Sequence, residues 1–448
     1  MQNKFTMLYS AKNLIFKKLN DFYLVFNPDA PNLVVVDEIG KAILESCKNG
    51  YYKNQLKDYI CKKFSCDVES FDEFIQSLMD SGFIGKGKPP IFKLTKRAPT
   101  LKSMVLHLTQ ECNLRCKHCF FSSGLPYEDE LSEKDISSIM KEFSLLGGES
   151  LIITGGEPFI KRSLLFELIK KARLQGVKHI SISTNGTLLT EEDAAFLREH
   201  RVEVGISLDG FNMETNDFIR GQGTYEKAIK AIKLLTGAGV HTTIGVTLMK
   251  PNINAAENFI KLAKSLGVPS VSFTLLRIKG RAKANENMLK ASPEEKVTAL
   301  KKIWKASRDL KVKTTVEQMW GALTELTPKN LCSAGRFSVC VAPNGDVYPC
   351  DAIMEEPFKA GNLRKQNLRE IWEHSEVFKL FRSLSVNDIE GCCECELKYV
   401  CGGGCLADNY SINGVLNKSL HDNCRVLKEI YWFMLSELAK DMWKELTN

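Results

Sequence analysis

The sequence predicts an α/β protein in three parts: a small N-terminal unit, a central domain of repeated strand-helix units and a cysteine-rich C-terminal domain. Three observations predict this organisation. Strand-like and helical segments alternate through the middle of the chain, a Pro/Lys/Gly-rich stretch separates them from the N-terminal unit, and cysteines cluster at close, uneven spacing. The chain has 448 residues, enough for two or three domains with cores of their own.

Residues 1–88 are predicted to form a winged-helix-like unit. Three short strand-like runs come first, with the turn-forming residues DAPN between the last two. Three helical patterns follow, and Gly82 is suited to cap the last one. We therefore expect a three-stranded sheet with three helices, followed by a linker over residues 89–101. The expected strands are LIFKKL, FYLVFN and NLVVVD.

Residues 102–310 repeat a strand-then-helix unit six times. Apolar residues return every three or four positions in the helical segments, and the strand segments are short and apolar. Consecutive βα units imply a parallel sheet with right-handed crossovers, so we expect a partial (β/α)6 TIM-like barrel. Its chemistry would lie at the C-terminal ends of the strands. The expected strands are SMVLHLTQ, SLIITG, HISIST, VEVGISL, HTTIGVTLM and SVSFTLL.

Composition and charge exclude several classes of protein. The net charge of +7 is mild and the lysines are scattered, which predicts a solvated surface in place of a nucleic-acid-binding stripe. No run of 18 apolar residues occurs, and the N-terminal segment lacks the features of a signal peptide. We expect a cytoplasmic protein that binds neither nucleic acid nor a membrane. In that reducing compartment, fifteen cysteines favour metal or iron–sulfur ligation over disulfides.

The first cysteine cluster follows the first expected barrel strand. Cys112, Cys116 and Cys119 have the spacing C-x3-C-x2-C. Three thiolates would leave one iron of a four-iron cluster open to an exchangeable molecule. A zinc site with His118 as fourth ligand is the alternative, but His118 adjoins Cys119 and the two would strain to share one tetrahedron.

A glycine-rich turn, TGGEP, follows the second expected strand. Gly155 and Gly156 expose backbone groups and allow close approach, while the Glu157 carboxylate can receive a ligand ammonium. On its own this pattern is only a tight βα loop. Directly after a C-x3-C-x2-C loop it favours a cofactor site.

Together these motifs resemble those of the radical S-adenosylmethionine (SAM) enzymes, and the resemblance covers residues 102–310. It implies that the three cysteines hold a [4Fe–4S] cluster whose open iron binds the amino and carboxylate groups of SAM. An electron from the cluster would cleave SAM to a 5′-deoxyadenosyl radical, which removes a substrate hydrogen atom. The electron would come from a reducing donor such as flavodoxin or ferredoxin.

The resemblance also implies a set of contacts to SAM. The Gly-Gly-Glu-Pro turn would bind the methionine amino group, two later strand ends would contact the ribose and the carboxylate, and an arginine would lie near the carboxylate. For the strand-end residues and the arginine, loop capping or a surface salt bridge is the alternative. The residues concerned are Gly155, Gly156, Glu157 and Pro158, then Ser183, Asn185, Ser207, Asp209 and Arg220.

The C-terminal cysteines have a second specific spacing. The pattern C-x2-C-x5-C-x3-C, with one more cysteine beyond and a G-x4-C before it, resembles the SPASM extension of radical SAM enzymes over residues 311–430. Residues 431–448 are expected to form a C-terminal helix. The resemblance implies two auxiliary [4Fe–4S] clusters, three in all; a zinc ribbon is the alternative for the C-x2-C alone. The implied ligands are Cys392, Cys395, Cys401 and Cys424 (distal), with Cys332, Cys350 and Cys405 (proximal).

The proximal cluster would then lack a fourth ligand. Cys340 lies on the same expected hairpin, but a two-residue turn at Asn344-Gly345 places Val339 opposite Cys350 and turns Cys340 to the other face. A bulge near Pro349 could bring it back. We expect an open iron or a ligand from the substrate. A substrate cysteine bound there would hold its sulfur ready to meet a carbon radical and form a thioether.

The N-terminal unit resembles the peptide-binding, RRE-like module of many maturases of ribosomally made peptides, with VVVDEIGKAIL and LMDSGFIG as its best-matching pieces. A leader peptide could add to the edge of its sheet and so concentrate the core peptide at the radical site. A purely structural cap is the alternative. We expect a radical SAM maturase that forms a cross-link in a precursor peptide, a thioether being favoured over a carbon–carbon link. The alternatives from other classes are a sulfatase-maturing, formylglycine-generating enzyme and a non-catalytic iron–sulfur electron carrier.

Overall fold

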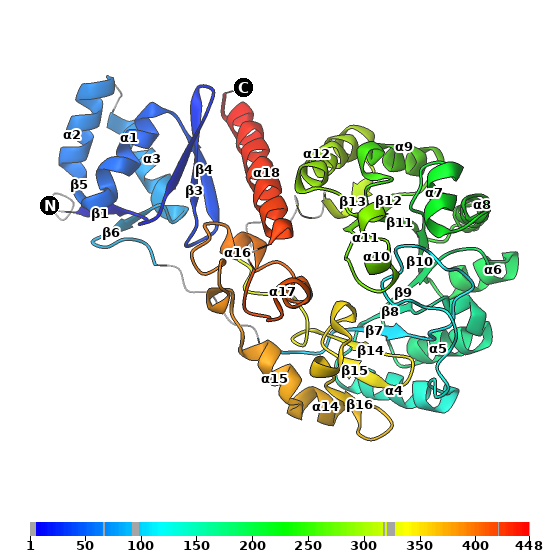
Figure 1. Ribbon diagram of the computed structural model, residues 1–448. Coiled ribbons are helices and arrows are strands. Elements are labelled where there is room, and N and C mark those ends of the chain that lie inside the picture. Colours follow the sequence, from blue (N-terminus) through cyan, green and yellow to red (C-terminus); the bar gives the residue numbers. More distant parts are fainter. Residues whose placement is uncertain are drawn as a thin grey trace.

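The structure is a computed structural model that describes residues 6–65, 68–91, 98–316, 319, 328–419 and 421–447. A small N-terminal unit, a large α/β domain and a C-terminal domain that ends in a long helix follow one another along the chain (Figure 1). Part of the expected linker lies outside the described residues.

The N-terminal unit contains the three expected strands and the three expected helices. The antiparallel sheet β2-β3-β4 consists of β2 (Ile15–Leu19), β3 (Phe22–Asn27) and β4 (Asn32–Val36), and the helices are α1 (Glu38–Ser46), α2 (Lys53–Phe64) and α3 (Val68–Asp80). A second small sheet, β5-β1-β6, was not expected. Its strands are β1 (Met7–Ser10), β5 (Tyr51–Tyr52) and β6 (Ile84–Lys86), too short and too distant in the sequence to leave a local signal.

The central domain is built on a ten-stranded, mostly parallel sheet in the order β13-β12-β11-β10-β9-β8-β7-β14-β15-β16. The six expected strands lie side by side in chain order and are parallel, which confirms the repeated βα units. They are β7 (Ser103–His107), β8 (Ser150–Thr154), β9 (His179–Thr184), β10 (Glu203–Ser207), β11 (Thr242–Leu248) and β12 (Ser270–Leu275). Within the described residues, β13 and β16 are not paired with each other, so the sheet is open.

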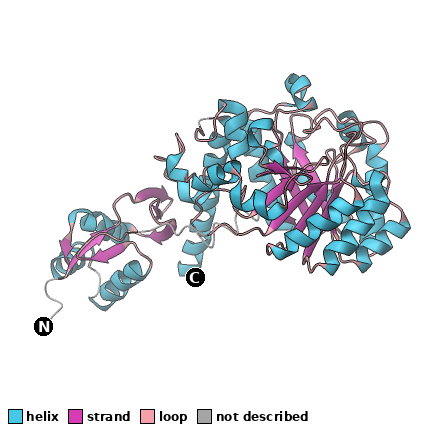
Figure 2. Ribbon diagram, turned by 90° about the horizontal axis from the view of Figure 1, so that it is seen from below, coloured by secondary structure: helices cyan, strands magenta, loops and turns pink. Residues whose placement is uncertain are grey.

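Amphipathic helices cover this sheet (Figure 2). Several begin with a capping box, in which a serine or threonine and a carboxylate three residues later exchange hydrogen bonds with the first turn. One buried face of each helix packs on the strands. The main helices are α4 (Glu133–Leu145), α5 (Arg162–Leu174), α6 (Glu191–Glu199), α7 (Met213–Arg220), α8 (Thr224–Gly237), α9 (Glu257–Ser265) and α12 (Pro293–Leu310), with the short α10 (Arg281–Ala284) and α11 (Glu286–Leu289) before α12.

The C-terminal domain extends the same sheet, which the sequence did not predict. β14 (Ser338–Val341) pairs in parallel with β7, and β15 (Asp346–Tyr348) and β16 (Gly361–Asn362) continue antiparallel from it. On the opposite edge, β13 (Lys313–Thr314) pairs with β12. Short helices follow: α14 (Leu368–His374), α15 (Glu376–Ser383), α16 (Lys398–Cys401) and α17 (Leu406–Asn413).

The last helix, α18 (Asp422–Thr447), runs from the C-terminal domain to the N-terminal unit (Figure 1). It begins before the expected boundary at residue 431 and packs on the N-terminal sheet. Trp443 stacks on Phe22 with ring centroids 4.8 Å apart, and Trp432 meets Phe26 edge-on at 5.7 Å. This contact buries one face of β3, with Phe22, Leu24 and Phe26, while Tyr23 and Val25 on the other face belong to the core of the N-terminal unit. No helix among the described residues is long and apolar enough to cross a membrane.

Candidate active site

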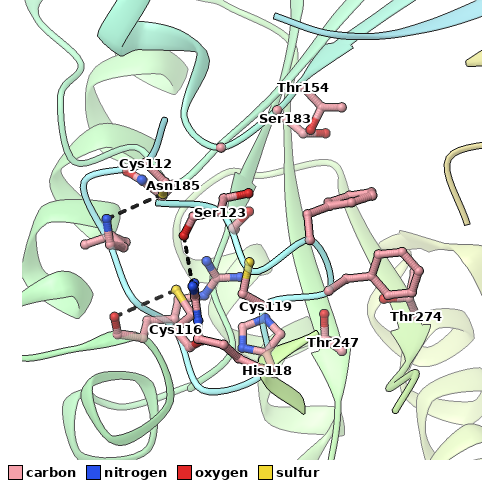
Figure 3. Close-up of a pocket in the computed structure, with 18 of the residues that line it drawn as sticks. Cys112, Cys116, His118, Cys119, Ser123, Thr154, Ser183, Asn185, Thr247 and Thr274 are labelled. Carbon is pink, nitrogen blue, oxygen red and sulfur yellow. Dashed lines mark hydrogen bonds between the residues drawn. The ribbon is translucent and has the colours of Figure 1, made fainter. Parts of the chain in front are cut away.

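The C-x3-C-x2-C loop follows β7 and borders a cavity of about 330 Å3 at the C-terminal ends of the parallel strands (Figure 3). The three cysteines lie on the cavity wall. Polar residues from the ends of neighbouring strands complete it, so the sheet brings together side chains that are far apart in the sequence. These are Thr154, Ser183, Asn185, Ser207, Thr247 and Thr274.

The cysteine loop is held by backbone contacts to the segment after β12. The Arg281 guanidinium donates to the carbonyls of Cys116 and Ser123, both at 2.9 Å, and its amide donates to the carbonyl of Cys119 at 3.0 Å. Gly280 has φ +57°, and a Cβ on it would lie 2.2 Å from the Phe120 carbonyl oxygen. The loop is therefore fixed before any ligand binds.

The Gly-Gly-Glu-Pro turn packs directly against the cysteine loop. A Cβ on Gly155 would lie 2.4 Å from the Thr109 carbonyl oxygen, and one on Gly156 only 2.0 Å from that of Glu111. The Gly156 and Glu157 amides donate to these two carbonyls at 2.7 and 2.8 Å. Glycine is required here by the closeness of two backbones, and both glycines reach the cavity wall.

The Glu157 side chain lies behind the cavity wall, unlike the two glycines before it. It is fully buried, and its carboxylate accepts hydrogen bonds from the Thr184 hydroxyl at 2.6 Å and from the amides of Asn185 and Phe159 at 2.8 and 3.1 Å. Burial raises the pKa of this carboxyl, while these bonds oppose the rise. The carboxylate therefore fastens the turn to the end of β9, and neither it nor Pro158 lies on the cavity wall.

An ion pair underlies one side of the cavity. Asp209 is fully buried, and its Oδ2 lies 2.7 Å from Nε of Arg220 and 3.1 Å from Nε2 of His118. Burial lowers the pKa of His118 to about 4, so the imidazole is neutral at neutral pH and Arg220 carries the balancing charge. Arg220 reaches the cavity wall, whereas Asp209 lies behind it and positions the guanidinium.

The four cysteines expected at the distal cluster close around one small cavity. Cys392, Cys395, Cys401 and Cys424 all line it, together with residues of α18. Burial raises the pKa of Cys401 to about 12. Such thiols would become thiolates only with a metal to balance their charge.

The three cysteines expected at the proximal cluster also gather in one place. Cys332, Cys350 and Cys405 pack against the same small apolar cluster of the C-terminal domain. Arg277, from the wall of the cavity at the strand ends, approaches Cys405 with Nη2 3.4 Å from Sγ and forms an ion pair with Asp408 at 2.7 Å. The strand-end cavity and the proximal cysteines are therefore neighbours.

The hairpin register corrects one prediction. Cys340 pairs with Tyr348, so Cys350, two residues further on, lies on the same face of the ribbon as Cys340. The prediction that Cys340 faces away is wrong, because the turn has three residues: Gly345 alone has positive φ, and the Ala342 amide donates to the Asp346 carbonyl. The Cys340 thiol is fully buried and contacts the Met354 sulfur at 3.6 Å.

Comparison with known proteins identifies the family. Residues 106–266 match the radical SAM superfamily, and residues 332–396 match the SPASM iron–sulfur cluster-binding domain. The chain is 34% identical over 310 residues to the mycofactocin maturase MftC of Mycolicibacterium smegmatis, an alignment that covers 68% of this chain and 77% of MftC. The chain belongs to the radical SAM superfamily. It is therefore an enzyme, and its C-terminal domain is a SPASM domain.

Other relatives of this radical SAM enzyme differ in their named activities. The AdoMet-dependent heme synthase of Oleidesulfovibrio alaskensis is 30% identical over 338 residues, which cover 71% of this chain and 85% of the synthase. The antilisterial bacteriocin subtilosin biosynthesis protein AlbA of Bacillus subtilis is 26% identical over 312 residues, 66% of this chain and 65% of AlbA.

Two solved structures have the same fold. The structure of anSMEcpe with bound AdoMet and the Kp18Cys peptide has a TM-score of 0.65 at 22% identity and covers 77% of this chain and 100% of anSMEcpe. Streptococcus suis SuiB bound to the precursor peptide SuiA has a TM-score of 0.61 at 16% identity and covers 93% of this chain and 99% of SuiB.

The residues around the strand-end cavity of this radical SAM enzyme fit a cluster and SAM. Three thiols, a glycine turn with exposed backbone and an arginine face one space. Nδ1 of His118 is buried beside it and has no hydrogen-bond partner among the residues that the structure describes. Among the described residues, no three His, Cys, Asp or Glu side chains converge closely enough to hold a single metal ion.

Sequence reasoning missed several residues of the site. Thr154, Thr247 and Thr274 lie at or near the ends of β8, β11 and β12, where the rule that chemistry gathers at strand ends could have found them. Arg277 follows β12 and could have been found in the same way. Arg281 carries no such signal, because its contacts depend on the path of a loop.

Proposed function

We propose that this enzyme is a peptide maturase that binds a ribosomally made precursor and forms an intramolecular cross-link in its core. The observation that carries the proposal is a single cavity that both sets of cysteines approach. The three cysteines of the first loop border it, and Arg277 on its wall contacts Cys405 of the proximal set. The names of MftC and AlbA, a maturase and a bacteriocin biosynthesis protein, support it. So does the precursor peptide bound to SuiB.

In this proposal, Cys112, Cys116 and Cys119 ligate a [4Fe–4S] cluster. The glycine turn, the strand-end residues and Arg220 bind SAM, whose cleavage supplies a 5′-deoxyadenosyl radical for hydrogen abstraction. The residues of this proposed SAM site are Gly155, Gly156, Glu157, Pro158, Ser183, Asn185, Ser207, Asp209 and Arg220. Of these, Glu157 and Asp209 act from behind the wall, one by fastening the turn and the other by positioning the guanidinium.

Two auxiliary clusters complete the proposed set of three. The distal one takes Cys392, Cys395, Cys401 and Cys424, and the proximal one takes Cys332, Cys350 and Cys405. We retain a substrate thiol as the fourth proximal ligand, because the Cys340 thiol is fully buried against Met354 whereas the other three thiols are partly exposed. A substrate sulfur held there favours a thioether over a carbon–carbon link.

The N-terminal unit is proposed to bind the leader peptide. β4 is an edge strand of the sheet β2-β3-β4, so an extended leader can add to it through main-chain hydrogen bonds. The match to SuiB covers 93% of this chain, and the match to anSMEcpe covers 77%. This difference favours a leader-dependent maturase over a sulfatase-maturing, formylglycine-generating enzyme. The proposed enzyme works in the cytoplasm with a reduced flavodoxin or ferredoxin as electron donor.

The decisive experiment is mass spectrometry of the short peptide encoded beside the gene, after reaction with the reconstituted enzyme, SAM and a reductant. A thioether removes two hydrogens per link and leaves one cysteine blocked to alkylation. One hydrogen leaves as an atom, taken by the 5′-deoxyadenosyl radical, and the other leaves as a proton plus an electron, which an auxiliary cluster would accept. Hydrogen loss with alkylatable cysteines would show a carbon–carbon link instead. A Cys116→Ala variant is the control that should form no product. An enzyme that makes no 5′-deoxyadenosine would be an electron carrier, and the proposal would fail.

A further inference from the structure

A second cavity, of about 520 Å3, lies beside the first. The two share four residues, namely Phe120, Leu276, Arg277 and Ala352. One wall of the second cavity comes from the segment after β12 and the start of α12, and the other comes from α17 and the start of α18. A substrate that reaches the cysteine-bordered cavity can therefore continue into this one.

The wall of the second cavity is rich in cations. Five basic side chains reach it, four from the segment between β12 and α12 and one, Lys296, from the start of α12. Three are held in ion pairs: Arg277 with Asp408 at 2.7 Å, Lys279 with Glu355 at 2.6 Å and Lys290 with Glu286 at 2.8 Å. For the other two, Lys283 and Lys296, no carboxylate of the described residues lies within 4.0 Å.

Lys296 is the less expected of these two cations. It is only 9% exposed, and it lies near the N-terminal end of α12, where the helix dipole disfavours positive charge. Its Nζ donates to Oδ1 of Asn423 at 3.1 Å, and Asp408 and Asp422 attract it only from beyond ion-pair distance. Burial lowers the pKa of this amine. A buried ammonium without a carboxylate partner costs free energy, which a ligand carboxylate would offset.

We infer that the second cavity holds the part of the core peptide that flanks the modified residue, and that Lys296 pairs there with a carboxylate of that peptide. This inference rests on the proposed function. The carboxylate comes from an Asp or Glu side chain or from the C-terminus of the peptide, because both present the same oxygens to an ammonium. The ion pair would fix which residue of the core reaches the first cavity.

The test compares Lys296→Met with Lys305→Met. Methionine keeps an unbranched stem of similar length and removes the charge, and Lys305 is an exposed lysine of the same helix outside the cavity. The substrate is the synthetic peptide encoded beside the gene. We expect K296M to raise KM about tenfold, the equivalent of about 1.4 kcal/mol, and K305M to leave KM unchanged. Iron content and melting temperature report whether each variant is folded.

Two altered peptides identify the source of the carboxylate. In one, each Asp and Glu near the modified residue is replaced by Asn or Gln; in the other, the C-terminus is an amide. One of them should raise KM about tenfold with the native enzyme and have no further effect with K296M. If neither altered peptide changes KM with the native enzyme, or if K296M leaves KM for the native peptide unchanged, this inference is wrong and the proposed function still stands. No modification of any peptide by the native enzyme overturns the proposed function.

Discussion

Replacing Gly156 with alanine tests how closely the two loops of the active site pack. The added Cβ would lie 2.0 Å from the Glu111 carbonyl oxygen, whereas real Cβ atoms stay at least 3.0 Å from such neighbours. The loops must therefore separate by about an ångström, which breaks one of the hydrogen bonds that join them at 2.7 and 2.8 Å. Overpacking of about 1–3 kcal/mol and a lost hydrogen bond of about 1 kcal/mol give a destabilisation of about 2–4 kcal/mol.

The assay is a thermal melt of Gly156→Ala and native enzyme, together with their iron content. For a unit of this size the melting temperature should fall by roughly 5–15 °C. Gly237→Ala is the matched control, since Gly237 ends α8 and the described part of the chain places no neighbouring atom within 4 Å of the added Cβ. It should raise stability by roughly 0.5–1 kcal/mol, because alanine is the better helix former. If both variants melt alike, the close packing of the loops does not hold.

Three further predictions concern residues outside the glycine turn. Burial lowers the pKa of His107 to about 4, so the free energy of unfolding, complete above about pH 6.5, falls as the pH falls. At pH 5 His107 accounts for about 2 kcal/mol of that decrease, which His107→Gln should abolish in urea unfolding at several pH values. Arg281→Met removes two hydrogen bonds to the cysteine loop and should speed proteolysis there several-fold, while Lys283→Met, on the same short helix, should not. Trp443→Ala removes a stacked aromatic pair and should raise KM for the full precursor but not for a leaderless core peptide; the exposed Leu446→Ala should change neither.

The sequence predicted those parts of the molecule in which the determining contacts are local. The six barrel strands and the three N-terminal helices follow from apolar periodicity. The first cysteine cluster follows from spacing, and the two auxiliary sets from the resemblance to the SPASM extension. Ser183 and Ser207, which the resemblance implied as SAM contacts, lie beside the cysteine loop because parallel strands bring their C-terminal ends to one edge.

What the sequence could not predict depends on contacts between distant segments. The pairing of β14 with β7 joins residues more than 200 positions apart in the chain, and no local pattern specifies it. The prediction of a two-residue hairpin turn was wrong for a local reason. Asn344-Gly345 is typical of a two-residue turn, but Pro343 before it fixes the backbone in a conformation that suits a three-residue turn, and one residue of register moves Cys340 to the face of Cys350.

The helix α18 sets a minimum length for the precursor. Its first turn carries Asn423 and lines the second cavity, and Trp432, nine residues further along, packs on Phe26 of the N-terminal sheet. At 1.5 Å per residue, these points lie about 14 Å apart along the helix. An extended peptide spans at most about 3.5 Å per residue, so a leader bound along β4 needs a spacer of at least about four residues before the core reaches the cavity. Precursors with the spacer shortened to about one residue should bind the enzyme normally yet remain unmodified, and those lengthened by about five should react. Efficient modification of the shortened peptides would show that the leader binds elsewhere.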